Sequence, residues 1–444
     1  MSVPHDTALD RSLTFLREGY NFLPHLRRQL GSPDVFTLRL LGQEAVCLSG
    51  AAGAELFYNQ QHFKREGAVP RRILTTLMGQ DGVQTLDDEA HRHRKALFMG
   101  LMGPGSLHRF SEHLADSWRA YLRRWEQVAE IQLFGEVEQV LCRAVCTWAG
   151  VPFEEGDIKP LAEDLSAMID AFGGVGPRHG RGKLARHRAE KWVGKLIDQV
   201  RAGRQYARPG SPLAAVAHFR DLNGELLGTR VASVELLNMV RPTIAIARFV
   251  AFEVVALHEH PEWVPRLRSG DATAIEWFVQ EVRRYYPFTP LLGARVRAPF
   301  TWGGYAFKQD QLVLLNVHGI DHDARQWGAD SHEFRPERFA DWNGSAFNFI
   351  PQGGGDQAHN HRCAGEWLTI EALKTTAVLL TTAMTYELPA QNLRIDLTRM
   401  PTLPASGVVL RHVRATNTYR PAAVAVPDAA ATWPAAGGKC PFGY

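Results

Sequence analysis

Hydrophobic and polar positions follow two different periods along this chain. Near its start, residues 35–41 and 45–48 are short aliphatic runs separated by Gly and Pro turns, a pattern that predicts strands. From about Asp87 to Leu267 the apolar residues recur three and four positions apart, which predicts a series of helices. A Gly-, Pro- and Arg-rich loop is expected to interrupt this series at 176–182.

The second half of the chain continues this mixture of periods. The mostly apolar stretch 231–257 predicts a long helix, and another helix should end at Tyr286, directly before Pro287. Short strands are expected at 293–297, 300–302 and 311–317, and a last helix should run from Cys363 to Tyr386. The chain is therefore predicted to be mainly α with a small β subdomain.

Composition narrows the class of protein further. The chain has 444 residues, of which 45% are hydrophobic, and a net charge of +3, with no basic run that would indicate a nucleic-acid partner. No segment of about 18 uninterrupted apolar residues predicts a membrane span. Residues 1–414 are predicted to form one catalytic domain, and the Ala- and Pro-rich residues 415–444 a flexible tail.

The number and spacing of the cysteines indicate the cellular compartment of the protein. The five cysteines, without any paired CxxC spacing, favour neither a disulfide framework nor a structural zinc site. The beginning of the chain also lacks the charged-then-apolar pattern of a secretory signal, so a cytoplasmic location is expected. The cysteines are Cys47, Cys142, Cys146, Cys363 and Cys440.

Cys363 follows a glycine-rich loop that begins near Phe349. It stands at the start of the apolar stripe of the last predicted helix, so its sulfur is expected to face inward. Backbone N–H groups at a helix N-terminus should lower the thiol pKa, and the small residues around it would let a flat macrocycle approach. A buried structural cysteine is the alternative, and spacing alone leaves both interpretations open.

Three motifs then occur in order: Glu281-x-x-Arg284, Pro336-Glu-Arg338-Phe, and His361-Arg-Cys363. Together they resemble the cytochrome P-450 superfamily, which implies the cytochrome P-450 fold and haem b with its iron ligated by the Cys363 thiolate. The resemblance also implies that the Glu281–Arg284 pair is buried and clamps Arg338. The long loop before the cysteine resembles the bacterial fatty-acid peroxygenase branch.

Arg241 and Pro242 interrupt the apolar helix 231–257. Pro242 should kink it, and Arg241 has no acidic residue three or four positions away, so it either reaches solvent, pairs with a distant acid or binds an external carboxylate. The acid–Thr pair that most of the superfamily carries in this helix is missing. Arg241-Pro242 is similar to the arginine–proline pair with which fatty-acid peroxygenases hold their substrate, which implies that Ala245, one turn on, faces the haem.

The resemblance implies hydroxylation of long-chain fatty acids at the α or β carbon by hydrogen peroxide, with some decarboxylation to a terminal alkene. The substrate carboxylate would act as general base and then acid, and no redox partner would be required. An oxygen-dependent monooxygenase served by separate redox partners is the main alternative. A peroxide isomerase or dehydratase is another, and Cys440-Pro441 is the sole support for a haem-binding sensor.

Further site residues follow from the same resemblance. Gln84 should face the haem, where decarboxylating members tend to have His, and this favours hydroxylation. Met78 is a nearby substrate-side position that could equally fill core space. Arg65 and His91 match positions that bind haem propionates, and Tyr286 would add a hydroxyl.

One cluster of polar residues is interpreted as structural. His318 and His322, flanked by Asp321 and Asp323, could suggest a metal site. Because they follow a predicted strand, at a place where the superfamily has a polar loop, a solvated loop is expected instead.

Overall fold

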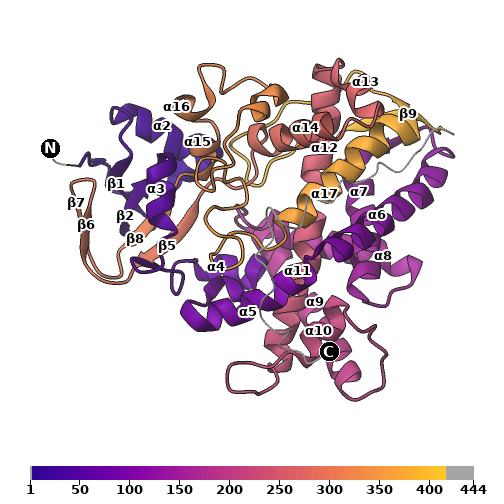
Figure 1. Cartoon of the computed structure of the whole chain (residues 1–444), viewed down its shortest axis with the longest axis horizontal. Coiled ribbons are helices and arrows are strands. Elements are labelled where there is room, and N and C mark those ends of the chain that lie inside the picture. The colour runs from indigo at the N-terminus through magenta and orange to yellow at the C-terminus, as the bar shows by residue number, and fades with distance from the viewer. Residues whose placement is uncertain (1–2, 417–444) are drawn as a thin grey trace.

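The sheet part of the molecule joins segments that lie far apart in the sequence (Figure 1). In the computed structural model, which describes residues 3–416, its five strands run in the order β1-β2-β8-β5-β3. β2 and β8 pair in parallel, Ala45 opposite Leu312, and the other neighbours are antiparallel. The strands are β1 (Val35–Leu40), β2 (Gln43–Leu48), β3 (Phe63–Lys64), β5 (Leu292–Val296) and β8 (Leu312–Leu315).

Two smaller sheets complete the β structure. One is an antiparallel hairpin, and the other is a three-stranded sheet in the order β4-β10-β9, which ties the end of the described chain to the helical part. The hairpin consists of β6 (Phe300–Trp302) and β7 (Tyr305–Phe307), and the second sheet of β4 (Glu130–Gln132), β9 (Met384–Glu387) and β10 (Val409–Ala415).

Helices make up most of the described chain, and Figure 1 shows the large helical layer beside the sheet part. Those associated with the sheet part or the loops near it are α1 (Ser12–Glu18), α2 (Phe22–Gln29), α3 (Gly50–Phe57), α4 (Arg71–Ile73), α15 (Val317–Asp321) and α16 (Ala324–Trp327). The others are α5 (Asp88–Leu101), α6 (Pro104–Trp125), α7 (Leu133–Ala149), α8 (Glu155–Asp170), α9 (Pro177–Arg201), α10 (Pro212–His218), α11 (Thr229–Ala245), α12 (Ala247–Glu259), α13 (Trp263–Arg268), α14 (Ala272–Tyr285) and α17 (Glu366–Val378). Short helical turns are η1 (Gly19–Asn21), η2 (Leu74–Met78), η3 (Val83–Thr85), η4 (Pro336–Ala340) and η5 (Leu379–Ala383).

Hydrophobic burial follows this division. One large core holds the helices together, and smaller cores lie around the five-stranded sheet. The mainly α fold with a small β part, the strands near 35–48 and 292–315, and the helix that ends before Pro287 are confirmed. The tail predicted for 415–444 lies outside the described residues except for Ala415 and Thr416.

Two of the predicted boundaries are wrong. Residues 177–182 form the first turns of α9 instead of a loop, because Pro177 occupies the first turn, where its missing N–H costs nothing, and Gly176 with a φ of 59° makes the turn into it. The last predicted helix ends earlier than Tyr386. α17 ends at Val378 and the π-helical turn η5 follows, after which Met384 begins β9, whose pairing with β10 overrides the helical spacing.

The long apolar helix is interrupted one turn later than predicted. α11 runs through Pro242 to Ala245, and α12 begins at Ala247. Pro242 has no N–H to donate, and at Ile246 the backbone turns more tightly, its N–H donating to the Thr243 carbonyl at 3.2 Å. In residues 3–416 we found no helix long and apolar enough to cross a membrane.

Candidate active site

Cys363 lies in the loop just before α17 and not at its first residue. Gly365 is the N-cap of α17, and the Cys363 N–H donates to the Gln352 carbonyl at 3.0 Å. Burial raises the pKa of the Cys363 thiol, and the Lys95 ammonium and the Gly365 N–H act in the opposite direction. The lowered thiol pKa expected from the helix N-terminus is therefore not found, because burial outweighs these two effects.

The glycines before Cys363 are required by close contacts. A Cβ at Gly354 would lie 2.5 Å from the Ala346 carbonyl oxygen, and one at Gly353 would lie 2.8 Å from the Tyr58 hydroxyl. Gly353 and Gly355 also have positive φ values of 94° and 78°, which side chains disfavour. The loop can therefore take this compact path only because glycine occupies these positions.

The predicted clamp is present and buried. Arg284 donates two hydrogen bonds to Glu281, at 2.7 and 2.8 Å, and Arg338 donates to the same carboxylate at 3.1 Å. The Arg335 N–H donates to it as well, at 2.8 Å. Arg284 and Arg338 donate further hydrogen bonds to the backbone carbonyls of Asp321, Trp327, Asp330, Ser331 and Glu333. The Glu281 carboxylate thus joins α14 to the segment that leads to the cysteine loop.

A second buried ion pair fixes the loop to α17. Arg283 donates to Glu366, and Arg362 donates to the other oxygen of that carboxylate at 2.5 Å. Arg283 also donates to the Gln352 side-chain carbonyl, at 3.1 and 3.2 Å. The residues on both sides of Cys363 are therefore held by the same arginine of α14.

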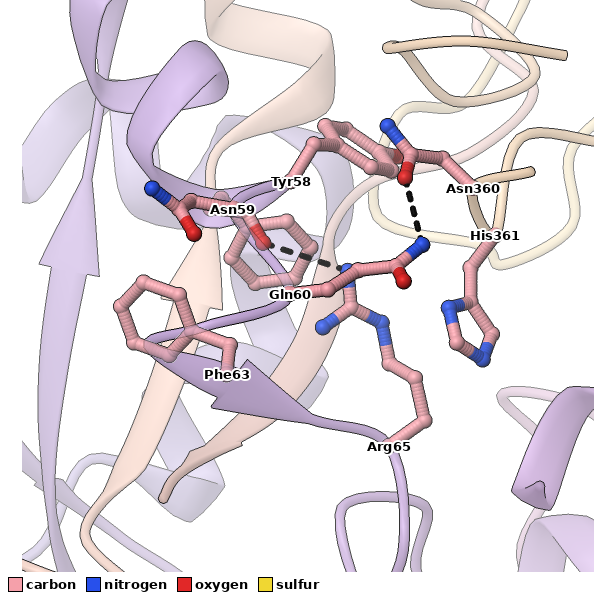
Figure 2. Close-up of a pocket in the computed structure, with 8 residues that line it drawn as sticks. Tyr58, Asn59, Gln60, Phe63, Arg65, Asn360 and His361 are labelled. Atoms are coloured by element: carbon pink, nitrogen blue, oxygen red, sulfur yellow. Dashed lines mark hydrogen bonds between the residues drawn. The ribbon is translucent and has the colours of Figure 1, made fainter. Parts of the chain in front are cut away.

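Four basic side chains gather next to the cysteine loop: Arg65, His91, Lys95 and His361. His91 stacks on His361 with ring centroids 3.8 Å apart, and Lys95 donates to the carbonyls of Asn360 and Arg362. Figure 2 shows Arg65 rising from the end of β3 toward Gln60, with His361 on the neighbouring loop. Within residues 3–416, no carboxylate forms an ion pair with any of the four.

Burial lowers the pKa of each of these four basic groups, and neighbouring cations lower it further. Burial lowers the pKa of His91 to about 4, with further contributions from Lys95 and Arg65. Burial also lowers the pKa of Lys95 to about 8. The Nδ1 atom of His91 is buried without a hydrogen-bond partner. A group carrying two carboxylates would offset this unbalanced positive charge.

These observations fit a haem. Cys363 is a partly exposed residue although its loop is packed on both sides, and the basic cluster beside it suits two propionates. Arg65 and His91 are brought together as predicted, and their contact with propionates remains a prediction. Lys95 and His361 were not predicted as site residues. Lys95 is buried like His91 and Arg94, whereas Arg92 is the exposed residue of this stretch of α5.

Tyr286 lies among aromatic side chains and not with this basic cluster. Its ring stacks on Phe252 with centroids 4.6 Å apart and contacts Tyr285 and Phe334. Its hydroxyl is buried without a partner. The structure thus places Tyr286 in an aromatic cluster between α12 and α14, and its predicted role as a propionate ligand has no support from these contacts.

Arg241 is buried on α11, with 6% of its surface exposed. Its Nη2 donates to the Asn238 side-chain carbonyl at 3.2 Å, and its Nε has no partner. Asn238 is a neutral partner on the same helix, three positions before Arg241, and was not predicted because only acidic residues were considered. Burial lowers the pKa of Arg241 to about 9, with a contribution from Arg186, whereas Cys363 acts in the opposite direction. Arg241 is therefore still protonated at pH 7, and no ion pair with a carboxylate of residues 3–416 balances it.

Gln84 lies beside Asn238, and its predicted position facing the haem remains a prediction. Its side-chain carbonyl accepts a hydrogen bond of 3.2 Å from the Asn238 amide, which also contacts Arg241. Pro242 is partly buried next to Arg241, and Ala245, one turn on, is buried at 6% exposure. Met78 ends the turn η2 and is partly buried, next to Gly79, which packs on Arg186 and Val234 of the neighbouring helices.

The residues set aside as a possible metal site are more buried than expected. His318 and Asp321 belong to the helix α15, and Asp321, 4% exposed, accepts a hydrogen bond from the Ile350 N–H at 2.8 Å. The solvated loop was thus a wrong prediction, because Asp321 supports the chain that leads to the cysteine loop. Over the described part of the chain, no group of three or more His, Cys, Asp or Glu could hold a metal ion.

The fold, the cysteine loop and its clamp together define a haem-thiolate protein. A sequence model of the family "Cytochrome P450" matches residues 271–397. A putative cytochrome P450 137 from Mycobacterium tuberculosis is 22% identical over 392 residues, covering 83% of this chain and 80% of that protein.

The sequence identity to several proteins of solved structure is higher. A variant of cytochrome P450SP alpha (CYP152B1) is 43% identical with a TM-score of 0.90, covering 92% of this chain and 100% of that one. Cytochrome P450EX alpha (CYP152N1) with myristic acid is 40% identical with a TM-score of 0.90, covering 94% and 100%. A variant of cytochrome P450 OleT in complex with arachidonic acid is 37% identical with a TM-score of 0.91, covering 95% and 100%. The chain belongs to the cytochrome P450 family, in the group of these CYP152 proteins. It is a haem-thiolate oxidoreductase, with Cys363 as the ligand of the haem iron.

Proposed function

We propose that this enzyme uses hydrogen peroxide to hydroxylate long-chain fatty acids at the α or β carbon, with some decarboxylation to a terminal alkene. The main support is Arg241, a buried guanidinium whose Nε has no partner and which no described carboxylate neutralises. A fatty-acid carboxylate would supply the missing negative charge and accept hydrogen bonds from it. Myristic and arachidonic acid are bound in structures of two similar proteins.

The group that transfers protons in this reaction must then belong to the substrate. Glu235 of α11 is occupied by Arg94 at 2.7 Å and by the Val83 N–H, and the Thr243 hydroxyl donates to the Met239 carbonyl at 3.0 Å. Neither side chain is free to pass protons. The carboxylate held at Arg241 is therefore the group that accepts a proton from peroxide and returns it during O–O cleavage.

Haem bound at Cys363 supplies the activation of peroxide and the transfer of oxygen. In hydroxylation, a C–H and the O–O bond break, a C–O bond forms, and the peroxide is reduced to water and an alcohol oxygen. In decarboxylation, one fatty acid and one peroxide give an alkene, carbon dioxide and two waters. Because Arg241 holds the carboxyl end, Cα and Cβ are the carbons nearest to it, which restricts the site of oxidation.

The test is to incubate the purified holoenzyme with a long-chain fatty acid and hydrogen peroxide and to identify the products by mass spectrometry. We expect 2- or 3-hydroxy acids without any reductase. Arg241→Ala should abolish this turnover, whereas Arg230→Ala, an exposed arginine of the same helix paired with Asp81, should not. Turnover that requires oxygen, NAD(P)H and a reductase would instead identify a monooxygenase with separate redox partners and overturn the proposal.

We also propose a cytoplasmic location. Cys47, Cys142, Cys146 and Cys363 are all free thiols in the described structure. Unpaired buried thiols are usual in a reducing compartment. Labelling the enzyme in fractionated cells of its source would test this proposal, and recovery with secreted proteins would contradict it.

A further inference from the structure

A chain of buried polar groups ends at Arg241. Glu235 is fully buried, and one of its oxygens accepts hydrogen bonds from Arg94 at 2.7 Å and from the Val83 N–H at 3.0 Å. Its other oxygen accepts from the Asn238 amide nitrogen at 3.5 Å. The Asn238 carbonyl in turn accepts from Arg241 at 3.2 Å. The chain therefore runs from α5 through Glu235 and Asn238 to Arg241.

The two ends of the Asn238 amide are not interchangeable here. Its nitrogen has two hydrogens and two acceptors, Glu235 and the Gln84 carbonyl at 3.2 Å. If the amide were reversed, its oxygen would face two other oxygens, and its N–H groups would face the guanidinium of Arg241. Both contacts would be repulsive in a site with almost no solvent. The Glu235 carboxylate and the Arg241 guanidinium therefore select the same orientation of Asn238.

This orientation has consequences for the two residues that Asn238 contacts. The Asn238 side-chain carbonyl accepts a hydrogen bond from Nη2 of Arg241, and the Nε of Arg241 has no partner. The Gln84 carbonyl is also occupied, so Gln84 turns its N–H donors elsewhere. Because Arg94 balances the charge of Glu235 at 2.7 Å, the carboxylate does not neutralise Arg241. The positive charge of Arg241 stays available to an external anion.

We infer that Glu235 is a positioning residue for fatty-acid binding, which acts through the Asn238 amide to orient Arg241 and Gln84. This inference rests on the proposed function, because it concerns the carboxylate that Arg241 would bind. Glu235 itself touches no substrate. It was not recognised in the sequence because its partners Val83 and Arg94 come from other segments of the chain, although Asn238 lies one helical turn away.

Glu235→Gln tests the inference. A glutamine retains one carbonyl oxygen for Arg94 and Val83, but its amide nitrogen then meets the Asn238 nitrogen, so Asn238 should turn its oxygen away from Arg241. In the holoenzyme, we expect the Kd for a long-chain fatty acid, measured by the spin-state change of the haem spectrum, to rise about tenfold, which corresponds to about 1.4 kcal/mol. The Kd for the fatty alcohol of the same chain length, measured by calorimetry, should stay unchanged because it carries no carboxylate.

The matched control is Glu253→Gln. Glu253 is also fully buried, lies on α12, and accepts its hydrogen bond from the Thr376 hydroxyl at 2.7 Å. The Kd of this variant for the fatty acid should stay within about twofold of the wild-type value. The reason is that the hydrogen bond of Glu253 goes to Thr376 and does not involve Asn238. In an Arg241→Ala background, Glu235→Gln should add no further loss, since the two residues act through one contact.

The outcomes separate the two hypotheses. If wild type binds the fatty acid and Glu235→Gln binds it equally well, the inference is wrong and the proposed function stands. If wild type shows neither binding nor peroxide-driven turnover, the proposed function fails first. Should Glu235→Gln not retain haem, Asn238→Ala removes the same link without changing a charge. An unaltered fatty-acid Kd in that variant would also overturn the inference.

Discussion

The Glu281 carboxylate accepts a hydrogen bond of 3.1 Å from Arg338, which lies 57 positions further along the chain. Glu281 is fully inaccessible and Arg338 is 8% exposed, so the contact is formed away from water. Arg284 and the Arg335 N–H complete the coordination of this carboxylate. Removing it leaves the buried Arg284 without its anion and leaves Arg338 with only Asp330, whose carboxylate lies 3.6 Å away.

Glu281→Ala should therefore destabilise the holoenzyme by about 3–5 kcal/mol and lower its haem content. Glu337→Ala is the matched control, since Glu337 pairs with Arg266 at 2.7 Å in an exposed contact next to the same clamp, and it should cost less than about 1 kcal/mol. Urea denaturation and the haem-to-protein ratio measure both effects. Equal stability of the two variants would contradict the role of the clamp.

Cys363→Ala should remove the red-shifted absorption band of the ferrous carbonyl complex, because that band requires a thiolate ligand. Cys47→Ala removes another buried thiol, in the sheet part of the molecule, and should keep the band while lowering stability. Absorption spectra of the reduced, carbon monoxide-treated proteins distinguish the two variants. Retention of the band in Cys363→Ala would reject this cysteine as the ligand.

Acid should destabilise the protein through His318. Burial, followed by His332 and Arg284, lowers the pKa of His318 to about 4, against about 6.5 in an unfolded chain. The unfolded state thus binds more protons between these values, and stability falls as the pH drops from 6.5 to 4.

His318→Phe retains a ring against Tyr20, whose centroid lies 5.6 Å away, and removes this titration. Between pH 6.5 and 4, wild type should lose on the order of 2 kcal/mol more than the variant. Urea denaturation at both pH values measures the difference. Parallel losses in the two proteins would show that His318 does not contribute.

Gln84→His should shift the products toward the terminal alkene. An imidazole next to Asn238 and Arg241 can exchange a proton with the bound carboxyl group, which an amide cannot. Gas chromatography of peroxide reactions gives the ratio of alkene to hydroxy acid. Gln84→Leu, which removes the amide without adding a titratable group, should leave the ratio nearer to that of wild type. An unchanged ratio in Gln84→His would exclude Gln84 from product selection.

Sequence patterns predicted the elements whose cause is local. The alternation in 35–48 and the proline after Tyr286 both act within a few residues, and the structure confirms β1, β2 and the end of α14. Met384 lies in β9 because β10, more than twenty residues later, pairs with it. Such non-local pairing overrides helical spacing and was not visible from one segment.

The same distinction holds for the site. Cys363 and the clamp were recognisable because each motif is short and the three occur in order. Asn238 and Glu235 act through partners on η3 and α5. Lys95 of α5 donates to two backbone carbonyls of the cysteine loop, which lie 265 and 267 positions later in the chain. The steps from Glu235 to Asn238 and Arg241 follow helical spacing, but no spacing rule connects them with η3 or α5, or Lys95 with the cysteine loop. Their roles follow from the direction in which hydrogen bonds are donated, which requires coordinates.

The parallel pairing of β2 with β8 affects how the protein is made. Ser49 and Asn316, which hydrogen-bond at the end of these strands, lie 267 positions apart. At a synthesis rate of about 5–20 residues per second, the first strands leave the ribosome roughly 15–50 s before their partner. During that interval the apolar side chains and unpaired edge of β2 remain uncovered. We therefore expect the nascent chain to be most prone to aggregation before its last third emerges.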